Sequence, residues 1–298
     1  MIELPVISTR PERKRLPEWL KKPLKLSEAV LDLKKDLRDR GLHTVCEEAM
    51  CPNLSECWSQ GTATLMILGD VCTRHCGFCS ITAGKPEAVD LEEPQKAAEL
   101  VQRLQLKHAV ITCVARDDLD DCGASHFVKV IEAIREKNPQ TIIEVLTTDF
   151  QMNPESMRKV CEAHPDVFNH NLETVRRLTD HVRHRATYDN SLEFLRRVKA
   201  FDSSIKTKSG IMLGLGETLD ETKQSLQDLR SMGCEILTIG QYLQPTTSNL
   251  PVIDYVRPEI FQELEVYARE LGFESVASGP FVRSSYHADK MLKVSHGI

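Results

Sequence analysis

The feature that most constrains this chain is a loop with the sequence CTRHCGFC at residues 72–79, directly after a short apolar segment. Three thiolates on so short a loop can each bind one iron of a [4Fe–4S] cluster, because thiolate sulfur suits the iron of such clusters. The fourth iron then has no protein ligand and can bind a substrate. The C-x3-C-x2-C spacing therefore predicts that Cys72, Cys76 and Cys79 hold an iron–sulfur cluster with one open iron.

A zinc site that combines these cysteines with His75 is the alternative. Structural zinc sites usually pair their ligands as C-x2-C, with a second pair further along the chain. The unequal gaps of three and two residues match that arrangement poorly. The spacing therefore favours the iron–sulfur interpretation.

The cysteine count also bears on the cellular compartment. Ten cysteines are present, and six of them lie between positions 46 and 79. The N-terminus lacks the apolar segment of a secretory signal, and no apolar run approaches the roughly 20 residues that span a membrane. We therefore expect a cytoplasmic protein with no membrane association, in which clustered cysteines act as metal ligands or catalytic thiols rather than as disulfides.

The charge of the chain argues against a nucleic-acid partner. Its 38 basic and 44 acidic residues give a net charge of −6 at pH 7, so the chain lacks the basic field of nucleic-acid binders. The first forty residues are locally basic, at residues 13–15 and 21–22. This segment is either a solvated leader or a docking surface for an acidic partner.

From residue 64 onward, short apolar segments alternate with helical patterns. Predicted strands cover residues 64–69, 108–113, 141–147, 167–171, 206–213 and 235–242, and predicted helices cover 94–105, 124–137, 154–163, 191–201, 222–232 and 258–271. Such alternation indicates parallel βα units. The first strand is not followed by a G-x-G-x-x-G turn, and polar residues gather at strand ends, which favours a barrel over a doubly wound sheet.

We therefore expect an α/β fold, a partial (β/α)6 TIM-like barrel with N- and C-terminal extensions. Residues 1–60 would form the N-terminal extension, 61–260 the barrel, and 261–298 a C-terminal helix and extension.

A second cysteine triad, Cys46, Cys51 and Cys57, precedes the predicted barrel with C-x4-C-x5-C spacing. Taken alone, this spacing fits packed cysteines as well as it fits metal ligands. Beside the first loop, it favours a second cluster.

Together these features resemble the lipoyl synthases, a family of radical S-adenosylmethionine (SAM) enzymes. The resemblance rests on both triads, on the aromatic Phe78 before Cys79, and on the sequence RSSY at residues 283–286. It includes the segments ECW at 56–58, ILG at 67–69, RDDL at 116–119, NLET at 171–174 and KSGIMLG at 208–214.

The resemblance implies two [4Fe–4S] clusters and SAM as cofactors. SAM would bind the open iron of the cluster in the CTRHCGFC loop, and reduction would split it to give a 5′-deoxyadenosyl radical. The second triad, Cys46, Cys51 and Cys57, would hold an auxiliary cluster completed by Ser285, with the adjacent Ser284 as the alternative ligand. A serine oxygen is harder than a thiolate and suits iron–sulfur chemistry less well, so it should be the ligand most easily displaced.

The implied reaction inserts two sulfur atoms, at C6 and C8, into an octanoyl chain carried on a lysine of a lipoyl carrier domain. It would use two SAM molecules per lipoyl group and consume the auxiliary cluster as the sulfur donor. Radical chemistry is needed because no side chain is basic enough to deprotonate a saturated carbon, and the cofactor carries that chemistry. The implied partners are the octanoylated carrier domain (2-oxoacid dehydrogenase E2 or glycine cleavage H protein), a reductant such as flavodoxin or ferredoxin, and an iron–sulfur carrier that renews the cluster.

Polar residues near strand ends are candidates for contact with SAM. Asn171 and Glu173 would bind the ribose or the methionine part, and Arg116 and Asp117 would fix the amino-acid part. The full set of candidates is Asn171, Glu173, Arg116, Asp117, Arg185, Lys208 and Ser209. For Glu173 the alternative is a residue in the first turn of a helix, where its charge complements the helix dipole. For Lys208, Ser209 and Arg185 the alternative is a position on a solvated face of the protein.

Residue Cys122 departs from the family pattern, which has Asp-Gly-Gly where this chain has Asp121-Cys122-Gly123. Cysteine tolerates a positive φ angle less well than glycine. Either the position is not left-handed in this chain or the loop shifts. The thiol would be packed in the interior or would act as an adventitious ligand.

Two other classes of protein fit part of the pattern. A biotin-synthase-like enzyme would lack both the C-x4-C-x5-C triad and the RSSY sequence. An iron–sulfur protein of electron transfer or cluster assembly would more often provide four cysteines per cluster.

Overall fold

The computed structural model describes residues 15–22, 28–59, 64–183 and 185–292. Two residues of the basic N-terminal segment, Arg13 and Lys14, lie outside these ranges. Within them, no helix combines the length and the apolar character that crossing a membrane requires.

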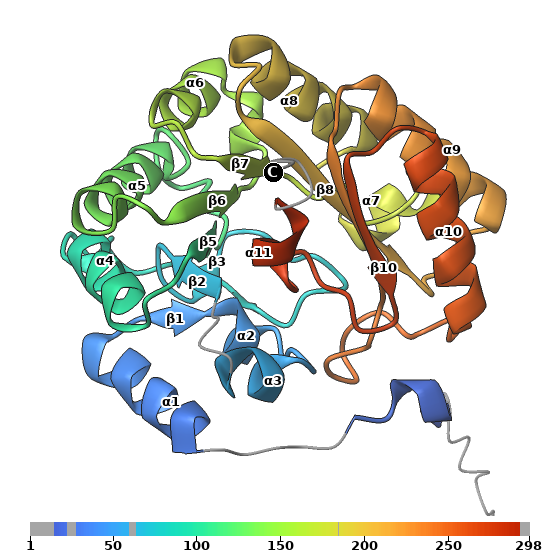
Figure 1. Cartoon of the computed structure of the whole chain (residues 1–298), viewed down its shortest axis with the longest axis horizontal. Helices are drawn as coiled ribbons and strands as arrows, with labels where there is room; N and C mark the ends of the chain where they lie inside the picture. The colour runs from blue at the N-terminus through green and yellow to red at the C-terminus, as the bar shows by residue number, and fades with distance from the viewer. Residues whose placement is uncertain (1–14, 23–27, 60–63, 184, 293–298) are drawn as a thin grey trace, which may run out of the picture.

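The fold is organised around one eight-stranded sheet with the order β1-β2-β5-β6-β7-β8-β9-β10. Seven strands are parallel, and only β1 (His43–Thr44) runs antiparallel to its neighbour. The parallel strands are β2 (Thr64–Ile67), β5 (His108–Cys113), β6 (Ile142–Leu146), β7 (Val167–Asn169), β8 (Lys206–Leu213), β9 (Ile236–Gln241) and β10 (Ser275–Gly279). Figure 1 shows these strands curving around the short helix α11 (Ala288–Met291). The partial barrel expected from the sequence is confirmed.

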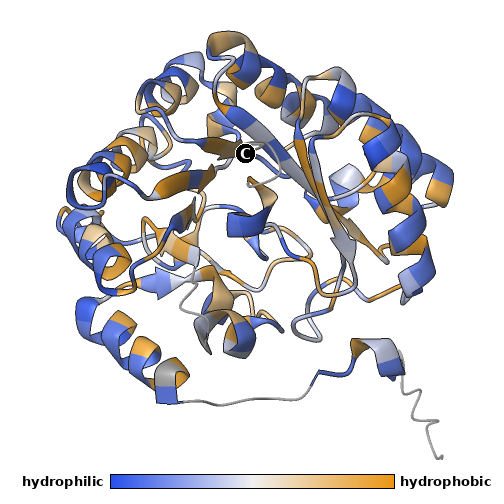
Figure 2. Ribbon diagram, in the orientation of Figure 1, coloured by the Kyte–Doolittle hydropathy of each residue, from blue (hydrophilic) through white to orange (hydrophobic). Residues whose placement is uncertain are grey.

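Helices that follow the strands cover the outer face of the sheet (Figure 1). They are α4 (Glu93–Arg103), α5 (Ala124–Lys137), α6 (Pro154–Glu162), α8 (Tyr188–Phe201), α9 (Leu219–Ser231) and α10 (Pro258–Glu270). These helices are banded with hydrophilic and hydrophobic residues in Figure 2, as expected when one face of a helix is buried. Between sheet and helices, Phe127, Phe150, Phe168 and Phe194 are at most 1% exposed, and each such ring stabilises the fold by about 1.5–3 kcal/mol.

Two helices begin three residues earlier than the sequence pattern predicts. For α8, the Thr187 side chain accepts a hydrogen bond from the backbone of Asn190. For α9, Thr218 and Glu221 form a reciprocal capping box. These caps satisfy backbone N–H groups that have no partner within the helix, so each helix starts at its cap rather than at its first apolar residue.

The barrel has seven parallel strands rather than the six predicted. The additional strand, β10, pairs with β9 in the register Ser275↔Ile236. Its sequence, SVASG, is short and mostly small residues, so it carries little of the β-branched and aromatic signal of a strand. Part of the expected C-terminal extension therefore completes the sheet.

Three helices of the N-terminal part of the chain pack beside β2, namely α1 (Glu28–Arg40), α2 (Val45–Glu48) and α3 (Leu54–Ser59). The short helix η1 (Glu18–Leu20) precedes them and lies away from β2 in Figure 1. Trp58 of α3 and Leu37 of α1 belong to the same buried cluster as Leu65 of β2. The extension that carries the second cysteine triad is thereby joined to the barrel core.

Candidate active site

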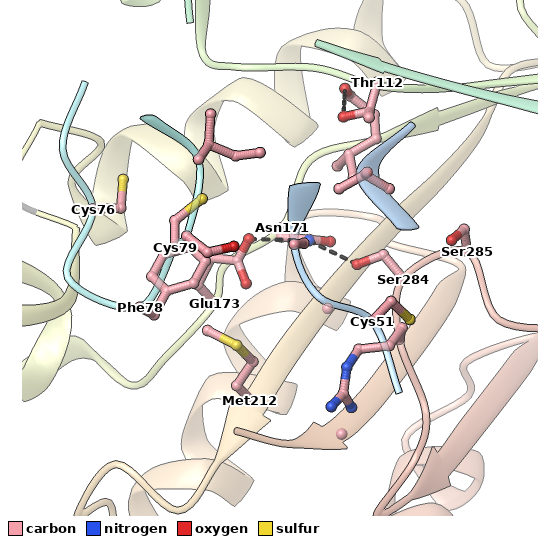
Figure 3. Close-up of a pocket in the computed structure, with 18 of the residues that line it drawn as sticks. Cys51, Cys76, Phe78, Cys79, Thr112, Asn171, Glu173, Met212, Ser284 and Ser285 are labelled. Atoms are coloured by element: carbon pink, nitrogen blue, oxygen red, sulfur yellow. Dashed lines mark hydrogen bonds between the residues drawn. The ribbon is translucent and has the colours of Figure 1, made fainter. Parts of the chain in front are cut away.

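A cavity of about 500 Å³ lies inside the barrel, lined by residues that follow β5, β6, β7 and β9. The predicted cluster ligands Cys46, Cys51, Cys72, Cys76 and Cys79 line it, together with Ser284 and Ser285. A smaller cavity of about 50 Å³ is lined by Cys57 and also by Cys46, Cys51 and Ser285. Both triads and the RSSY serines therefore surround neighbouring spaces, and Figure 3 shows several of these side chains.

The CTRHCGFC loop is held in place by segments far away in the sequence. It begins in the two-stranded pair of β3 (Val71–Cys72) and β4 (Thr82–Ala83). Asn249 Nδ2 donates to the carbonyl of Cys79 at 2.8 Å, and Gly77 N donates to the carbonyl of Val182 at 3.0 Å. A Cβ atom on Gly77 would lie 2.9 Å from the Leu250 side chain, so glycine is needed for this close approach.

Two cysteines of the loop, Cys76 and Cys79, are buried in surroundings that favour the protonated thiol. Burial raises the pKa of Cys76 to about 11 and that of Cys79 to about 12. Both thiols would have to lose their protons to hold a cluster, since thiolate is the form that ligates metal.

The donor set fits a cluster in which each sulfur binds a different iron. Among the described residues, no three His, Cys, Asp or Glu side chains gather closely enough to hold a single metal ion. A cluster does not require that convergence, because its irons are separate.

A buried polar group lies beside the loop, just past the end of β7. The Arg183 guanidinium donates to the carbonyl of Asn171, and Asn171 Nδ2 donates to Glu173 Oε1 at 3.0 Å. Burial lowers the pKa of Arg183, and the negative charges of Glu173 and Cys76 act against that shift. Asn171 Oδ1 is buried and has no hydrogen-bond partner among the described residues. The group therefore offers a cation, a carboxyl and an amide oxygen to a polar ligand.

The backbone at Glu173 is left-handed, with φ of 69°. Its carbonyl accepts from Met212 N at 2.8 Å, and it forms an isolated bridge with Ile211 of β8. Glu173 is therefore not in the first turn of a helix, which was the alternative interpretation. Burial raises the pKa of its carboxyl, while Arg183 acts to lower it.

The second triad lies on two short helices, and on the loop between them that carries Cys51, at the amino end of β2. Thr44 caps α2, which carries Cys46, and Cys57 lies in α3. Burial raises the pKa of Cys46 to about 11. The side chains of Thr64 and Met66, which project from the same face of β2, line the cavity between the two triads.

The C-terminal segment closes this second site through contacts with the N-terminal helices. Thr64 Oγ1 donates to Ser285 Oγ at 2.7 Å. Tyr286 Oη donates to Glu56 Oε1 at 2.9 Å, and Asn53 Nδ2 donates to the carbonyl of Phe281 at 2.7 Å. Residues from the two ends of the chain therefore build one site.

Comparison with known proteins identifies the family. The family model of the radical SAM superfamily matches residues 66–229, and that of the N-terminal domain of lipoyl synthase matches residues 4–51. A lipoyl synthase of Symbiobacterium thermophilum is 52% identical over 97% of this chain and 91% of its own. Another, from Geobacillus kaustophilus, is 53% identical over 96% of both chains.

The chain belongs to the lipoyl synthase family.

It is thus a radical SAM enzyme that inserts sulfur, with SAM and [4Fe–4S] clusters as cofactors. Solved structures of low identity share its fold. Streptococcus suis SuiB bound to S-adenosylmethionine has a TM-score of 0.58 at 9% identity, over 76% of this chain and 53% of that one. HydG, a maturase of the [FeFe]-hydrogenase, has a TM-score of 0.55 at 15% identity, over 85% and 63%.

Three of the predicted SAM-contacting residues of this lipoyl synthase family member line the large cavity, namely Asn171, Glu173 and Arg185. Arg185 lies at its rim, with its side chain 59% exposed and 3.6 Å from Asp117.

The four other predicted SAM contacts lie outside the cavity lining. Arg116 forms a two-pronged pair with Asp118, with both N–O distances 2.9 Å. Asp117 forms a similar pair with Arg74 at 2.8 Å. The hydroxyl of Ser209 accepts from the backbone N–H of Leu172 at 3.1 Å.

Lys208 is fully buried rather than part of a solvated face. Its Nζ lies 2.7 Å from Glu144 Oε1, and His108 Nε2 lies 3.1 Å from the other oxygen of that carboxyl. Although burial acts to raise it, Lys208 and His108 lower the pKa of Glu144 to about 2. This charged group fills the barrel interior, because its members project from β5, β6 and β8.

Sequence reasoning missed Arg183, Thr64 and Arg74. Arg183 lies two residues before the predicted Arg185, and only the fold shows which of the two arginines points inward. Arg74 lies inside the CTRHCGFC loop and could have been noted from that position. Thr64 gave no signal, since its contact with Ser285 joins residues 221 positions apart.

Cys122 is left-handed, with φ of 53°, and Gly123 follows with φ of 89°. The loop therefore keeps a left-handed conformation despite the cysteine, at a cost of about 1–2 kcal/mol. Cys122 is 5% exposed and packs in the main hydrophobic cluster. Its side chain lies outside the lining of the large cavity.

Proposed function

We propose that the two cysteine triads take separate roles in the lipoyl synthase reaction. Cys72, Cys76 and Cys79 would hold the cluster that binds SAM, and the triad of Cys46, Cys51 and Cys57 would hold the auxiliary cluster. When bound, the first cluster supplies the electron that cleaves SAM and the second supplies sulfur. The observation that carries this proposal is the single cavity lined by members of both triads.

Arg183, Glu173 and Asn171 form the proposed SAM-binding group. The buried guanidinium would pair with the carboxylate of SAM, since charge-assisted hydrogen bonds are strongest away from water. The Glu173 carboxyl and the unpartnered Asn171 Oδ1 would accept from the ammonium or from the ribose hydroxyls. Arg185 would contact SAM from the rim of the cavity.

The remaining predicted contacts take supporting roles in this proposal. Arg116 and Asp117 would hold the loop after β5, because each is committed to an ion pair. Lys208 would neutralise Glu144 in the barrel interior, and Ser209 would fix the backbone of Leu172.

Ser285 would complete the auxiliary site, as its place beside Cys46, Cys51 and Cys57 supports. Ser284 is the less favourable ligand, because it is absent from the lining of the smaller cavity and its hydroxyl lies at the proposed SAM-binding group instead.

The octanoyl chain would lie along the apolar part of the cavity between the triads. Phe78, Met66, Ile211 and Met212 line this part, and burial of each methylene against them would contribute about 0.8 kcal/mol. Figure 3 shows Phe78 and Met212 near Cys79. The reacting carbons would then have access to both clusters without leaving the cavity.

The physiological setting follows from the same assignment. We propose an octanoylated lipoyl domain of a 2-oxoacid dehydrogenase or the glycine cleavage H protein as the substrate, with flavodoxin or ferredoxin as reductant and an iron–sulfur carrier for cluster renewal. The enzyme would act in the cytoplasm. Functionally, residues 1–60 would supply auxiliary ligands, 61–260 the SAM site, and 261–298 the RSSY serines.

Anaerobic turnover with SAM, dithionite and an octanoyl-lysine peptide tests this function. We expect deoxyadenosine together with monothiolated and dithiolated peptide. Deoxyadenosine without any thiolated peptide would reject sulfur insertion. Analysis of the reconstituted enzyme should find about eight irons per chain, as two four-iron clusters require, and a protein that retained only zinc would contradict the assignment.

A further inference from the structure

The adjacent serines of the RSSY sequence bind two different parts of the site. Ser285 Oγ accepts from Thr64 Oγ1 at 2.7 Å, at the auxiliary triad. Ser284 Oγ accepts from Asn171 Nδ2, also at 2.7 Å, in the proposed SAM-binding group. Figure 3 shows Asn171 between Glu173 and Ser284, with a hydrogen bond to each. One short segment therefore contacts both halves of the active site.

Ser284 helps to fix the orientation of the Asn171 amide. An asparagine side chain has two N–H donors, and Nδ2 of Asn171 donates to both Ser284 Oγ and Glu173 Oε1. The opposite oxygen faces Gly210, where a Cβ atom would lie only 3.0 Å from it. The amide nitrogen is thus held by two acceptors, and Ser284 is the one that the C-terminal segment supplies.

The RSSY segment can couple to the barrel because it packs closely on it. The carbonyl of Val282 would lie 2.1 Å from a Cβ on Gly240 of β9. Beyond that point, side-chain hydrogen bonds of Ser284, Ser285 and Tyr286 connect the segment to the loop after β7, to β2 and to α3. Moving the segment would break the contact of Ser284 with Asn171 along with that of Ser285.

We propose that Ser284 is a positioning residue that holds Asn171, and through it Glu173, in the orientation that binds SAM. SAM binding and docking of residues 283–286 are then coupled. The inference rests on the proposed function, because it assumes that Asn171 contacts SAM. By linkage, the factor by which docking strengthens SAM binding is the factor by which SAM strengthens docking.

The coupling gives the enzyme a safeguard. SAM binds tightly while the segment that supplies the auxiliary-cluster serine is in place. Once that segment leaves, Asn171 loses one partner and SAM binds more weakly. Cleavage of SAM is thereby favoured in enzyme whose sulfur-donor site is assembled.

The test measures equilibrium binding of S-adenosylhomocysteine and of SAM to the reconstituted full-length enzyme, anaerobically and without reductant. Ser284→Ala should weaken binding about fivefold to tenfold, the effect of leaving one buried N–H without its acceptor. Ser278→Ala is the matched control, because it removes a hydroxyl that donates to the Phe261 carbonyl at 2.7 Å on the neighbouring strand β10. It should change binding less than twofold.

A double-mutant cycle with Asn171→Ala locates the effect. If Ser284 acts through Asn171, the double variant should bind no more weakly than Asn171→Ala alone. Additive losses would overturn the proposal, and so would unchanged binding by Ser284→Ala. If Asn171→Ala itself binds normally, the proposed SAM contact fails first. If Asn171→Ala weakens ligand binding and Ser284→Ala leaves it unchanged, only the coupling is rejected.

Hydrogen exchange gives a readout that a purely structural role would not change. Adding S-adenosylhomocysteine should slow amide exchange at residues 283–286 in the wild type and in Ser278→Ala, and not in Ser284→Ala. If Ser284→Ala does not retain both clusters, Ser284→Thr takes its place, since threonine keeps the acceptor oxygen and should preserve binding within twofold. Loss of binding with Ser284→Thr, or equal protection in all variants, would overturn the proposal.

Discussion

The two cysteine triads of this enzyme are built in opposite ways. Cys72, Cys76 and Cys79 lie on one eight-residue loop that is anchored by the barrel. Cys46 and Cys57 lie on two short helices with Cys51 in the loop between them, and the proposed fourth ligand, Ser285, comes from the far end of the chain. One site is local in sequence and the other is assembled across the whole fold.

This difference has consequences for folding and for chemistry. Long-range closure carries an entropic cost that a short loop does not. The loop triad can therefore gather its thiols early, whereas the second site is complete only once the C-terminal segment has docked. A site assembled in this way can also be opened by moving one segment, which suits a cluster that is consumed.

Removing the cysteines of the CTRHCGFC loop is the strongest test of the separate roles proposed for the two triads. Alanine at Cys72, Cys76 or Cys79 should lower deoxyadenosine formation by at least about a thousandfold, equivalent to about 4 kcal/mol in the barrier, because SAM loses its binding iron. Product analysis by liquid chromatography measures this effect. Cys161→Ala, which changes a buried cysteine of α6, should retain SAM cleavage. Substantial cleavage by the loop variants would break the assignment.

Removing the second triad should separate SAM cleavage from sulfur insertion. Alanine at Cys46, Cys51 and Cys57 should leave deoxyadenosine formation measurable and abolish thiolated peptide, because the electron source remains and the sulfur source is lost. The iron content should fall from about eight to about four per chain. Thiolated product from this triple variant would show that sulfur comes from another source.

The contrast between the sites also explains what the sequence could predict. The barrel was predictable because each βα unit carries its own periodicity, and the loop triad because three ligands lie within eight residues. The seventh strand, β10, was missed because SVASG lacks large apolar residues. Its pairing with β9 decides its conformation, and that contact is not local.

Side-chain direction was the other limit. Arg183 and Arg185 look alike in the sequence, yet one is buried beside Glu173 and the other is largely exposed at the rim. Lys208 seemed suited to a solvated face, and its partner Glu144 lies 64 residues away. A single sequence does not contain these pairings, because they arise only when strands are placed side by side.

A third prediction compares two arginines of the proposed SAM-binding site, one buried and one exposed. Arg183→Met should weaken SAM binding about tenfold to a hundredfold, as expected for loss of a buried charge-assisted hydrogen bond. Arg185→Met should have a smaller effect, below about fivefold, because water screens its exposed side chain. Equilibrium binding of S-adenosylhomocysteine measures both. Equal effects of the two variants would place SAM nearer the rim than proposed.

The smallest expected effect concerns the anchoring of the auxiliary site. Tyr286→Phe removes the hydrogen bond to Glu56, a carboxyl whose pKa is lowered by Lys22 and further by Tyr286. The loss should be about 1 kcal/mol, and it should act on docking of the C-terminal segment rather than on the loop triad. A chelator should then remove about four irons roughly fivefold faster than in the wild type, with the other four unaffected.

Tyr267→Phe provides the control for this experiment, since it removes a tyrosine hydroxyl on the outer helices that accepts from Gln227 Nε2 at 2.6 Å. It should leave the rate of iron release unchanged. If Tyr286→Phe accelerated the loss of all irons equally, the two clusters would share one determinant of stability, and the separation of a local site from an assembled one would fail. Selective release would show that the assembled site depends on contacts between the two ends of the chain.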